Sequence, residues 1–208
     1  MLAQMLEGTG VSLQLFALTL LFALPLGLAV ALGRMSRNRW LSGAVNGYML
    51  AMRGTPLILQ LIFIYFAPYY LFGASFDRFA AAVAAFSINY AAYFGEIFRG
   101  GLESIPVGQH EAGKVLGFTR AQVFFRIALP QAAKRALPAM GNEVITLVKD
   151  TALAQTIGVA ELFRVAQTAS SRQFSTVPIF VAGVFYFAMN WGVAHAFARM
   201  ERKLGYYR

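Results

Sequence analysis

The sequence predicts an all-α integral membrane protein with five transmembrane helices in one domain that covers residues 1–208. Hydrophobic residues make up 58% of the chain and charged residues 13%, whereas a soluble domain has about 45–50% and about 25%. The mean hydropathy is +0.57, and the apolar residues form runs near the roughly 20 residues that cross a bilayer core. The composition therefore argues against a soluble globular enzyme.

The five expected spans are apolar runs bounded by charged or turn residues. Leu13–Leu32 contains no charged residue. Pro56–Phe72 has a single strongly polar member, a glutamine, and Phe79–Phe98 contains one asparagine and one glutamate. Ala136–Thr156 is the most polar run, and Val177–Phe197 contains one asparagine and one histidine.

The basic residues predict the orientation, because Lys and Arg are retained on the cytoplasmic side of a membrane. Fourteen of the 18 lie in connections on one side, which we assign to the cytoplasm, and three lie in the opposite connections. The N-terminus is therefore expected outside and the C-terminus in the cytoplasm. The cytoplasmic bases are Arg34, Arg37, Arg39, Arg53, Arg99, Lys114, Arg120, Arg126, Lys134, Arg135, Arg199, Arg202, Lys203 and Arg208.

The sequence shows no catalytic or metal-binding constellation. It has no cysteine, its two histidines lack a ligand partner at helical spacing, and its serines belong to no nucleophile motif. The net charge of +9 is spread between apolar runs, which argues against a nucleic-acid partner. We expect neither an enzyme nor a metalloprotein.

The connections outside the spans are also expected to contain helices. The long inner connection covers about residues 99–135. Within it, His110–Leu116 is predicted as a helix ended by Gly117, and Arg120–Ala128 as a second helix ended by Pro130. An outer connection, residues 158–176, is predicted to contain another short helix near the membrane surface.

The inner connection carries a spaced motif. Glu111-Ala112-Gly113 is followed after three residues by Gly117, and nine residues later by Ile127-Ala128-Leu129-Pro130. This pattern resembles the EAA loop of ABC importer permeases, with Gly113 where alanine is usual. The resemblance implies that Glu111, Ala112, Gly113 and Gly117 couple the membrane domain to an ATPase.

Further segments are similar to permeases of the polar amino acid uptake family, whose fold is the type I ABC importer transmembrane domain. They include Arg53-Gly54-Thr55-Pro56-Leu57, the run Ala92–Gly101, and Leu147–Thr151. The resemblance implies a bacterial inner-membrane subunit that pairs with an identical or related transmembrane subunit. It also implies two ATPase subunits, which bind ATP and Mg, and an extracytoplasmic amino-acid-binding protein. This sequence has no P-loop of the form GxxxxGK[ST].

Polar side chains inside spans are costly and therefore suggest a substrate pathway. The fourth span carries five within an arc of about 120°, at about 100° per residue. The third span carries a narrower stripe, and the fifth contributes one asparagine. The candidate pathway residues are Asn142, Glu143, Thr146, Lys149, Asp150, Asn89, Tyr93, Glu96 and Asn190.

An amino acid zwitterion needs an acceptor for its ammonium group and a donor for its carboxylate. We assign Glu143 or Asp150 to the ammonium group and Lys149 to the carboxylate. Structural ion pairs are the alternative, and for Glu96 a pair with Arg99 is favoured. For the whole chain, the alternative function is an ATP-independent channel or secondary transporter for polar solutes.

Overall fold

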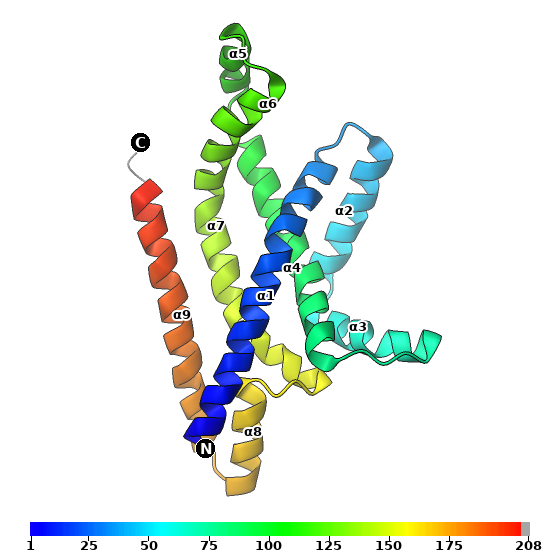
Figure 1. Cartoon of the computed structure of the whole chain (residues 1–208), viewed down its shortest axis with the longest axis vertical. Coiled ribbons are helices and arrows are strands. Elements are labelled where there is room, and N and C mark those ends of the chain that lie inside the picture. Colours follow the sequence, from blue (N-terminus) through cyan, green and yellow to red (C-terminus); the bar gives the residue numbers. More distant parts are fainter. Residues whose placement is uncertain (205–208) are drawn as a thin grey trace.

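The computed structural model of the chain describes residues 1–204, and every secondary-structure element in that range is helical. Arg208, one of the expected cytoplasmic bases, lies outside the described residues. The long helices α1, α4, α7 and α9 form the body, with α5 and α6 at one end and α8 beside the N-terminus at the other (Figure 1). The elements are α1 (Leu2–Arg34), α2 (Arg39–Gly54), α3 (Leu57–Phe72), α4 (Arg78–Glu103), α5 (Val107–Val115), α6 (Arg120–Val123), the π-helical turn η1 (Phe124–Ala128), α7 (Leu129–Asp150), the 3₁₀ helix η2 (Thr151–Ile157), α8 (Leu162–Gln173) and α9 (Val177–Leu204).

Three of the described helices, α1, α4 and α9, are long and apolar enough to cross a membrane. The pair α2 and α3 passes the same test only when taken together, as one broken span. α7, which contains most of the expected fourth span, has 22 residues, but five of them are charged. The number of spans therefore stays a prediction.

The second expected span is present as helix α3 at its predicted position, but α3 does not pass the test for a membrane span by itself. A separate helix, α2, precedes it, and α2 and α3 are bent by 109° relative to each other. Proline disfavours helical backbone in the residue before it, and Thr55 is extended, with φ −121° and ψ 146°. Arg53, which we expected in an inner loop, therefore lies in the last turn of α2 beside this break.

The inner connection contains the first expected helix as α5, with Gly117 in the left-handed region at φ +75° just after it. The prediction that Pro130 ends the second helix is wrong, because α6 continues through η1 into α7. Pro130 occupies the first turn of α7, where helices tolerate proline. The π-helical turn before it absorbs the change in hydrogen-bond register.

Helices α1 and α4 pack closely because glycine faces the partner helix on both sides. A Cβ atom added to Gly27 would lie 2.8 Å from the Cβ of Phe94, and one added to Gly95 would lie 2.6 Å from Cγ1 of Val30. Small residues of this kind allow helix backbones to approach each other inside membranes. The α1–α4 pair forms the centre of the fold, and Phe94 is fully buried in it.

A buried carboxylate joins α1, α8 and α9 near the N-terminal end of the molecule. Glu161 is 0% exposed and accepts hydrogen bonds from the backbone N–H groups of Phe163 and Arg164, each at 2.7 Å. It also accepts from the hydroxyl groups of Tyr186, at 2.8 Å, and Ser12, at 3.4 Å. Burial raises the pKa of the Glu161 carboxyl, although these hydrogen bonds act in the opposite direction. The sequence analysis did not single out this residue.

Candidate functional site

A cavity of about 550 Å³ lies where the α2–α3 break faces α4 and the end of α7. Its volume falls within the range of small-molecule sites, about 300–1,000 Å³. The break, α4, α7 and η2 all contribute to its wall. The lining residues are Arg53, Gly54, Thr55, Pro56, Leu57, Asn89, Tyr90, Tyr93, Glu143, Thr146, Asp150 and Leu153.

Two amide side chains hold the break in place. The Gln60 amide donates to the main-chain oxygen of Met52 at 2.9 Å and to the Thr55 hydroxyl at 2.8 Å. The Asn89 amide donates to the same Met52 oxygen at 3.0 Å and to the Gln60 side-chain oxygen at 2.9 Å. The last carbonyl groups of a helix have no partner within the helix, so these amides satisfy a carbonyl group that the bend leaves free.

Charged groups of both signs face the cavity. Glu143 and Asp150 come from α7, and Arg53 comes from the end of α2. The Tyr90 hydroxyl donates a hydrogen bond of 2.7 Å to Oδ2 of Asp150. The Arg53 guanidinium lies 5.7 Å from the centre of the Tyr93 ring, within the cation–π range of about 6 Å. The cavity thus offers acceptors for a cation and a donor for an anion.

Five of the nine predicted pathway residues line this cavity. Asn89 and Tyr93 contribute from α4, and Glu143, Thr146 and Asp150 contribute from α7. The other four predicted residues are not part of its lining: Asn142, Lys149, Glu96 and Asn190.

Helical geometry explains why the stripe on α7 divides. At about 100° per residue, Thr146, Asp150 and Glu143 fall within about 60° of one another, whereas Asn142 and Lys149 lie together on the adjoining side. Lys149 instead lines a second hollow of about 310 Å³, between α7, α8 and α9. Among the described residues, the cation that lines the cavity at the α2–α3 break is therefore Arg53, whereas the sequence analysis assigned Lys149 to the substrate carboxylate.

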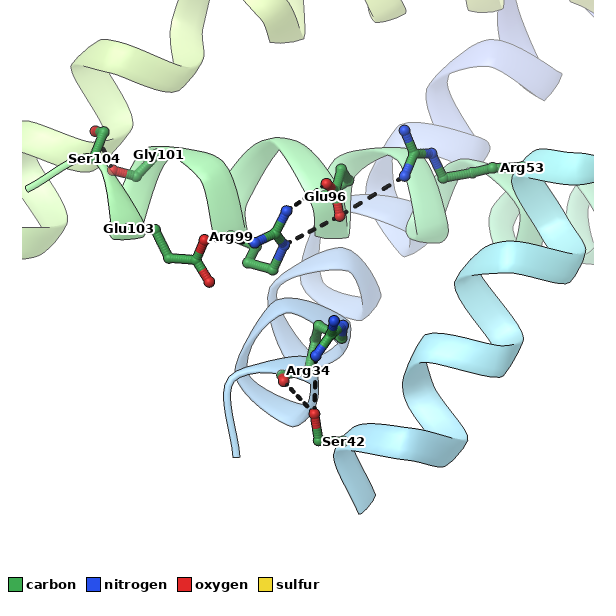
Figure 2. Close-up of polar contacts among 8 residues, drawn as sticks. All are labelled: Arg34, Ser42, Arg53, Glu96, Arg99, Gly101, Glu103 and Ser104. Carbon is green, nitrogen blue, oxygen red and sulfur yellow. Dashed lines mark hydrogen bonds and ion pairs between the residues drawn. The ribbon is translucent and has the colours of Figure 1, made fainter. Parts of the chain in front are cut away.

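Glu96 lies beside the cavity in a row of charges along α4, shown in Figure 2. Its Oε1 is 2.6 Å from Nη2 of Arg99, and Arg99 is also 2.5 Å from Glu103. The structural pair favoured for Glu96 is therefore confirmed. Arg53 approaches Glu96 only to 3.8 Å, so its guanidinium is held weakly and faces the cavity as well.

The segment with the EAA-like motif forms the end of the molecule that contains α5 and α6 (Figure 1). Glu111, Ala112 and Gly117 are exposed, whereas Gly113 is buried. A Cβ atom added to Gly113 would lie 2.7 Å from Cγ2 of Val123. Gly113 therefore permits α5 to pack on its own chain, which differs from the expected contact of this glycine with an ATPase.

The same segment has an exposed apolar surface. Val107, Val115 and Leu116 have exposed fractions of 70%, 87% and 70%. Apolar groups exposed together on a surface are typical of a contact with another protein. The sequence analysis predicts a contact with an ATPase for this segment, and the name coupling surface here denotes its exposed residues Val107, Glu111, Ala112, Val115 and Leu116.

Sequence reasoning missed Arg53 and Tyr90 as cavity residues. Arg53 belongs to a segment already recognised as similar to amino acid permeases, but we counted it as a loop charge because the α2 helix was not foreseen. No pattern in the sequence marks Tyr90 as a cavity residue. Only the packing of α4 on α7 brings its hydroxyl group to Asp150.

Comparison with known proteins shows similarity along nearly the whole chain. The octopine transport system permease protein OccM of Rhizobium radiobacter is 38% identical over 95% of this chain and 84% of that protein. The L-cystine transport system permease protein TcyB of Bacillus subtilis is 41% identical over 86% of this chain and 77% of that protein. A crystal structure of an amino acid ABC transporter with histidines contains a chain of the same fold, with a TM-score of 0.89 and 34% identity over 97% of this chain and 94% of that one.

Residues 23–206 match the family described as binding-protein-dependent transport system inner membrane component. The match includes the cavity, the row of charges on α4 and the coupling surface. The chain belongs to this family of inner membrane components of binding-protein-dependent transport systems.

Proposed function

We propose that this chain is the permease subunit of an ATP-driven importer that moves a polar amino acid into the cytoplasm. Relatives named as octopine and cystine transport system permeases support this function, as does the fold shared with an amino acid ABC transporter. The observation that carries the proposal is the cavity that Arg53, Glu143 and Asp150 all line.

These three residues suit the two charged groups of an amino acid. A guanidinium binds a carboxylate through two parallel hydrogen bonds, so Arg53 receives the substrate carboxylate. Glu143 accepts from the substrate ammonium group, and the nearby Thr146 and Tyr93 complete the polar wall. Asn89 serves mainly to hold the α2–α3 break, because its amide already donates two hydrogen bonds.

The coupling surface binds the ATPase subunit in this proposal. Val107, Val115 and Leu116 provide apolar contact area, and Glu111 provides a charged anchor. ATP and Mg bind to the partner, of which two copies serve a pair of identical or related transmembrane subunits. The N-terminus and α8 face the extracytoplasmic binding protein, and the C-terminus lies in the cytoplasm of a bacterial cell.

Transport by the purified complex tests the proposal. The permease, co-purified with its ATPase subunit and reconstituted in liposomes with the binding protein, should take up radiolabelled amino acids only when ATP is supplied on the ATPase side. A complex in which the Glu111→Lys variant is present should assemble less ATPase. Uptake by the permease alone, without ATP, would instead support a channel or secondary transporter.

A further inference from the structure

Three polar side chains from different helices meet at the base of α8, and we call Ser12, Glu161 and Tyr186 the α8 joint. The Ser12 hydroxyl accepts a hydrogen bond of 3.3 Å from the N–H group of Leu162 and lies 3.4 Å from Oε2 of Glu161, to which it donates. The first N–H groups of a helix have no partner within the helix, so Ser12 and Glu161 together hold the first turn of α8 on α1. A Cβ atom added to Gly8 of α1 would lie 3.0 Å from Cα of Leu162. The two helices are therefore in close contact at this joint.

A short segment connects the α8 joint to the substrate cavity. Residues 158–160 alone separate η2 from Glu161, and Leu153 of η2 lines the cavity. The hydroxyl of Tyr186 in the joint also interacts with the hydroxyl of Thr151, the first residue of η2. Thr151 is 1% exposed, so this contact lies inside the fold. A displacement at the base of α8 therefore reaches the cavity wall through few residues.

An open groove runs along one side of α8, which lies beside the N-terminal end of α1 (Figure 1). Its volume is about 670 Å³, and residues of α1 and α8 form most of its wall. Glu7 of α1 and Arg164 and Arg172 of α8 line it, but no ion pair within residues 1–204 joins these charges. Protein interiors are close-packed, so a groove of this size leaves α8 room to tilt. Tilting toward α1 would bring charges of opposite sign together.

We propose that Glu161 is a positioning residue for transport: with Ser12 and Tyr186 it forms the pivot about which α8 tilts when the extracytoplasmic binding protein docks. The tilt moves η2 and with it the cavity wall. This inference rests on the proposed function, in which α8 faces that protein, and it assigns the route from the docking surface to the cavity. The fixed side of the pivot is α1, because α1 packs closely on α4 at Gly27 and Gly95.

Removal of single hydroxyl groups tests the proposal in the assembled complex. Tyr186→Phe and Ser12→Ala each break bonds of the α8 joint but leave Glu161 as the cap of α8. The complex of permease and ATPase in nanodiscs is titrated with the binding protein of the same system, loaded from a mixture of the protein-forming amino acids. Both variants should keep the basal ATPase rate and the binding-protein concentration for half-maximal stimulation, whereas the maximal stimulation should fall by at least about fivefold. Thr9→Ala is the matched control on α1, because the Thr9 hydroxyl donates to the Met5 main-chain oxygen of the same helix.

Amide hydrogen exchange follows η2 directly. Docking of the binding protein should change exchange in residues 151–157 of the unchanged complex and of the Thr9→Ala complex. In the Tyr186→Phe and Ser12→Ala complexes, docking should leave exchange in this segment as it was. If the hydroxyl groups only stabilise the fold, the variants should instead yield less complex, and the complex that remains should be stimulated normally. That result would overturn the inference.

The outcomes separate this inference from the proposed function. If both variants are stimulated as strongly as the unchanged complex, the inference is overturned and the proposed function stands. A higher half-saturating concentration with full maximal stimulation would place the α8 joint in the docking surface itself, which also overturns the inference. If the unchanged complex is neither stimulated by the binding protein nor able to take up amino acids with ATP, the proposed function fails as well. Should Tyr186→Phe not assemble, Ser12→Ala decides the question alone.

Discussion

The side-chain amide of Asn89 on α4 donates a hydrogen bond of 2.9 Å to the side-chain oxygen of Gln60 on α3. Through this bond, two polar residues from different expected spans fix the corner between α2 and α3. Gln60 and Asn89 are both buried, at 8% and 3% exposed. The position of Arg53 at the cavity therefore depends on an amide pair that lies behind it.

We expect Asn89→Leu to destabilise the assembled complex. The substitution keeps a side chain of similar size but leaves the Gln60 oxygen without its donor, and a buried polar group without a partner costs about 1–3 kcal/mol. Thermal unfolding of the purified complex measures the effect. Thr168→Ala serves as the control, because Thr168 is exposed and, among residues 1–204, its hydroxyl bonds only to the Arg164 main-chain oxygen of the same helix. An unfolding temperature equal to that of the control would contradict a structural role for Asn89.

Arg53 and Lys149 are predicted to differ in their effect on substrate recognition. Arg53→Gln should raise the substrate concentration needed for half-maximal ATPase stimulation by about tenfold or more, because a hydrogen bond to a charged group contributes about 1.5–3 kcal/mol. Lys149→Met should leave this concentration nearly unchanged, since Lys149 lines a different hollow. Titration of ATPase activity with substrate measures both. The reverse pattern would restore the expectation from sequence that Lys149 receives the substrate carboxylate.

Gly113 is predicted to be needed for packing inside the coupling segment. Gly113→Ala places a methyl group 2.7 Å from Cγ2 of Val123, so α5 should shift and ATP-driven uptake should fall. Val123→Ala removes the obstructing atoms and should restore uptake in the double variant. Gly108→Ala is the matched control on α5, because the added group meets no atom of residues 1–204 within 4 Å apart from its chain neighbours and its own helix backbone. Loss of uptake that Val123→Ala cannot restore would indicate that Gly113 contacts the ATPase directly.

The predicted orientation can be tested by cysteine labelling, because the chain has no native cysteine. Met35→Cys lies just after α1, and Ser171→Cys lies on α8 at the opposite end of the molecule (Figure 1). A membrane-impermeant maleimide should label Ser171→Cys in intact cells, and Met35→Cys only after permeabilisation. Labelling of Met35→Cys in intact cells would reverse the orientation.

The sequence predicted the long apolar helices and the coupling segment better than it predicted the cavity. The apolar runs and the left-handed turn at Gly117 are set by residues that are close together in the sequence. α4, α5 and α9 therefore lie close to their expected positions. The break between α2 and α3 depends on Pro56 and on the distant amide of Asn89. The choice between Arg53 and Lys149 depends on which side of α7 meets α4. Such long-range contacts leave no periodic pattern in a single sequence.

The glycines that bring α1 and α4 together also limit how the cavity can change shape during a transport cycle. At Gly27 and Gly95, Phe94 and Val30 of the partner helix pack directly against the glycine backbone, so α1 and α4 move as one rigid pair. Tyr90 and Tyr93 line the cavity from α4, so this part of the cavity wall belongs to the rigid pair. Opening and closing of the cavity must then come from tilting of α7 or from bending at the α2–α3 corner, while α1 and α4 keep their positions relative to each other.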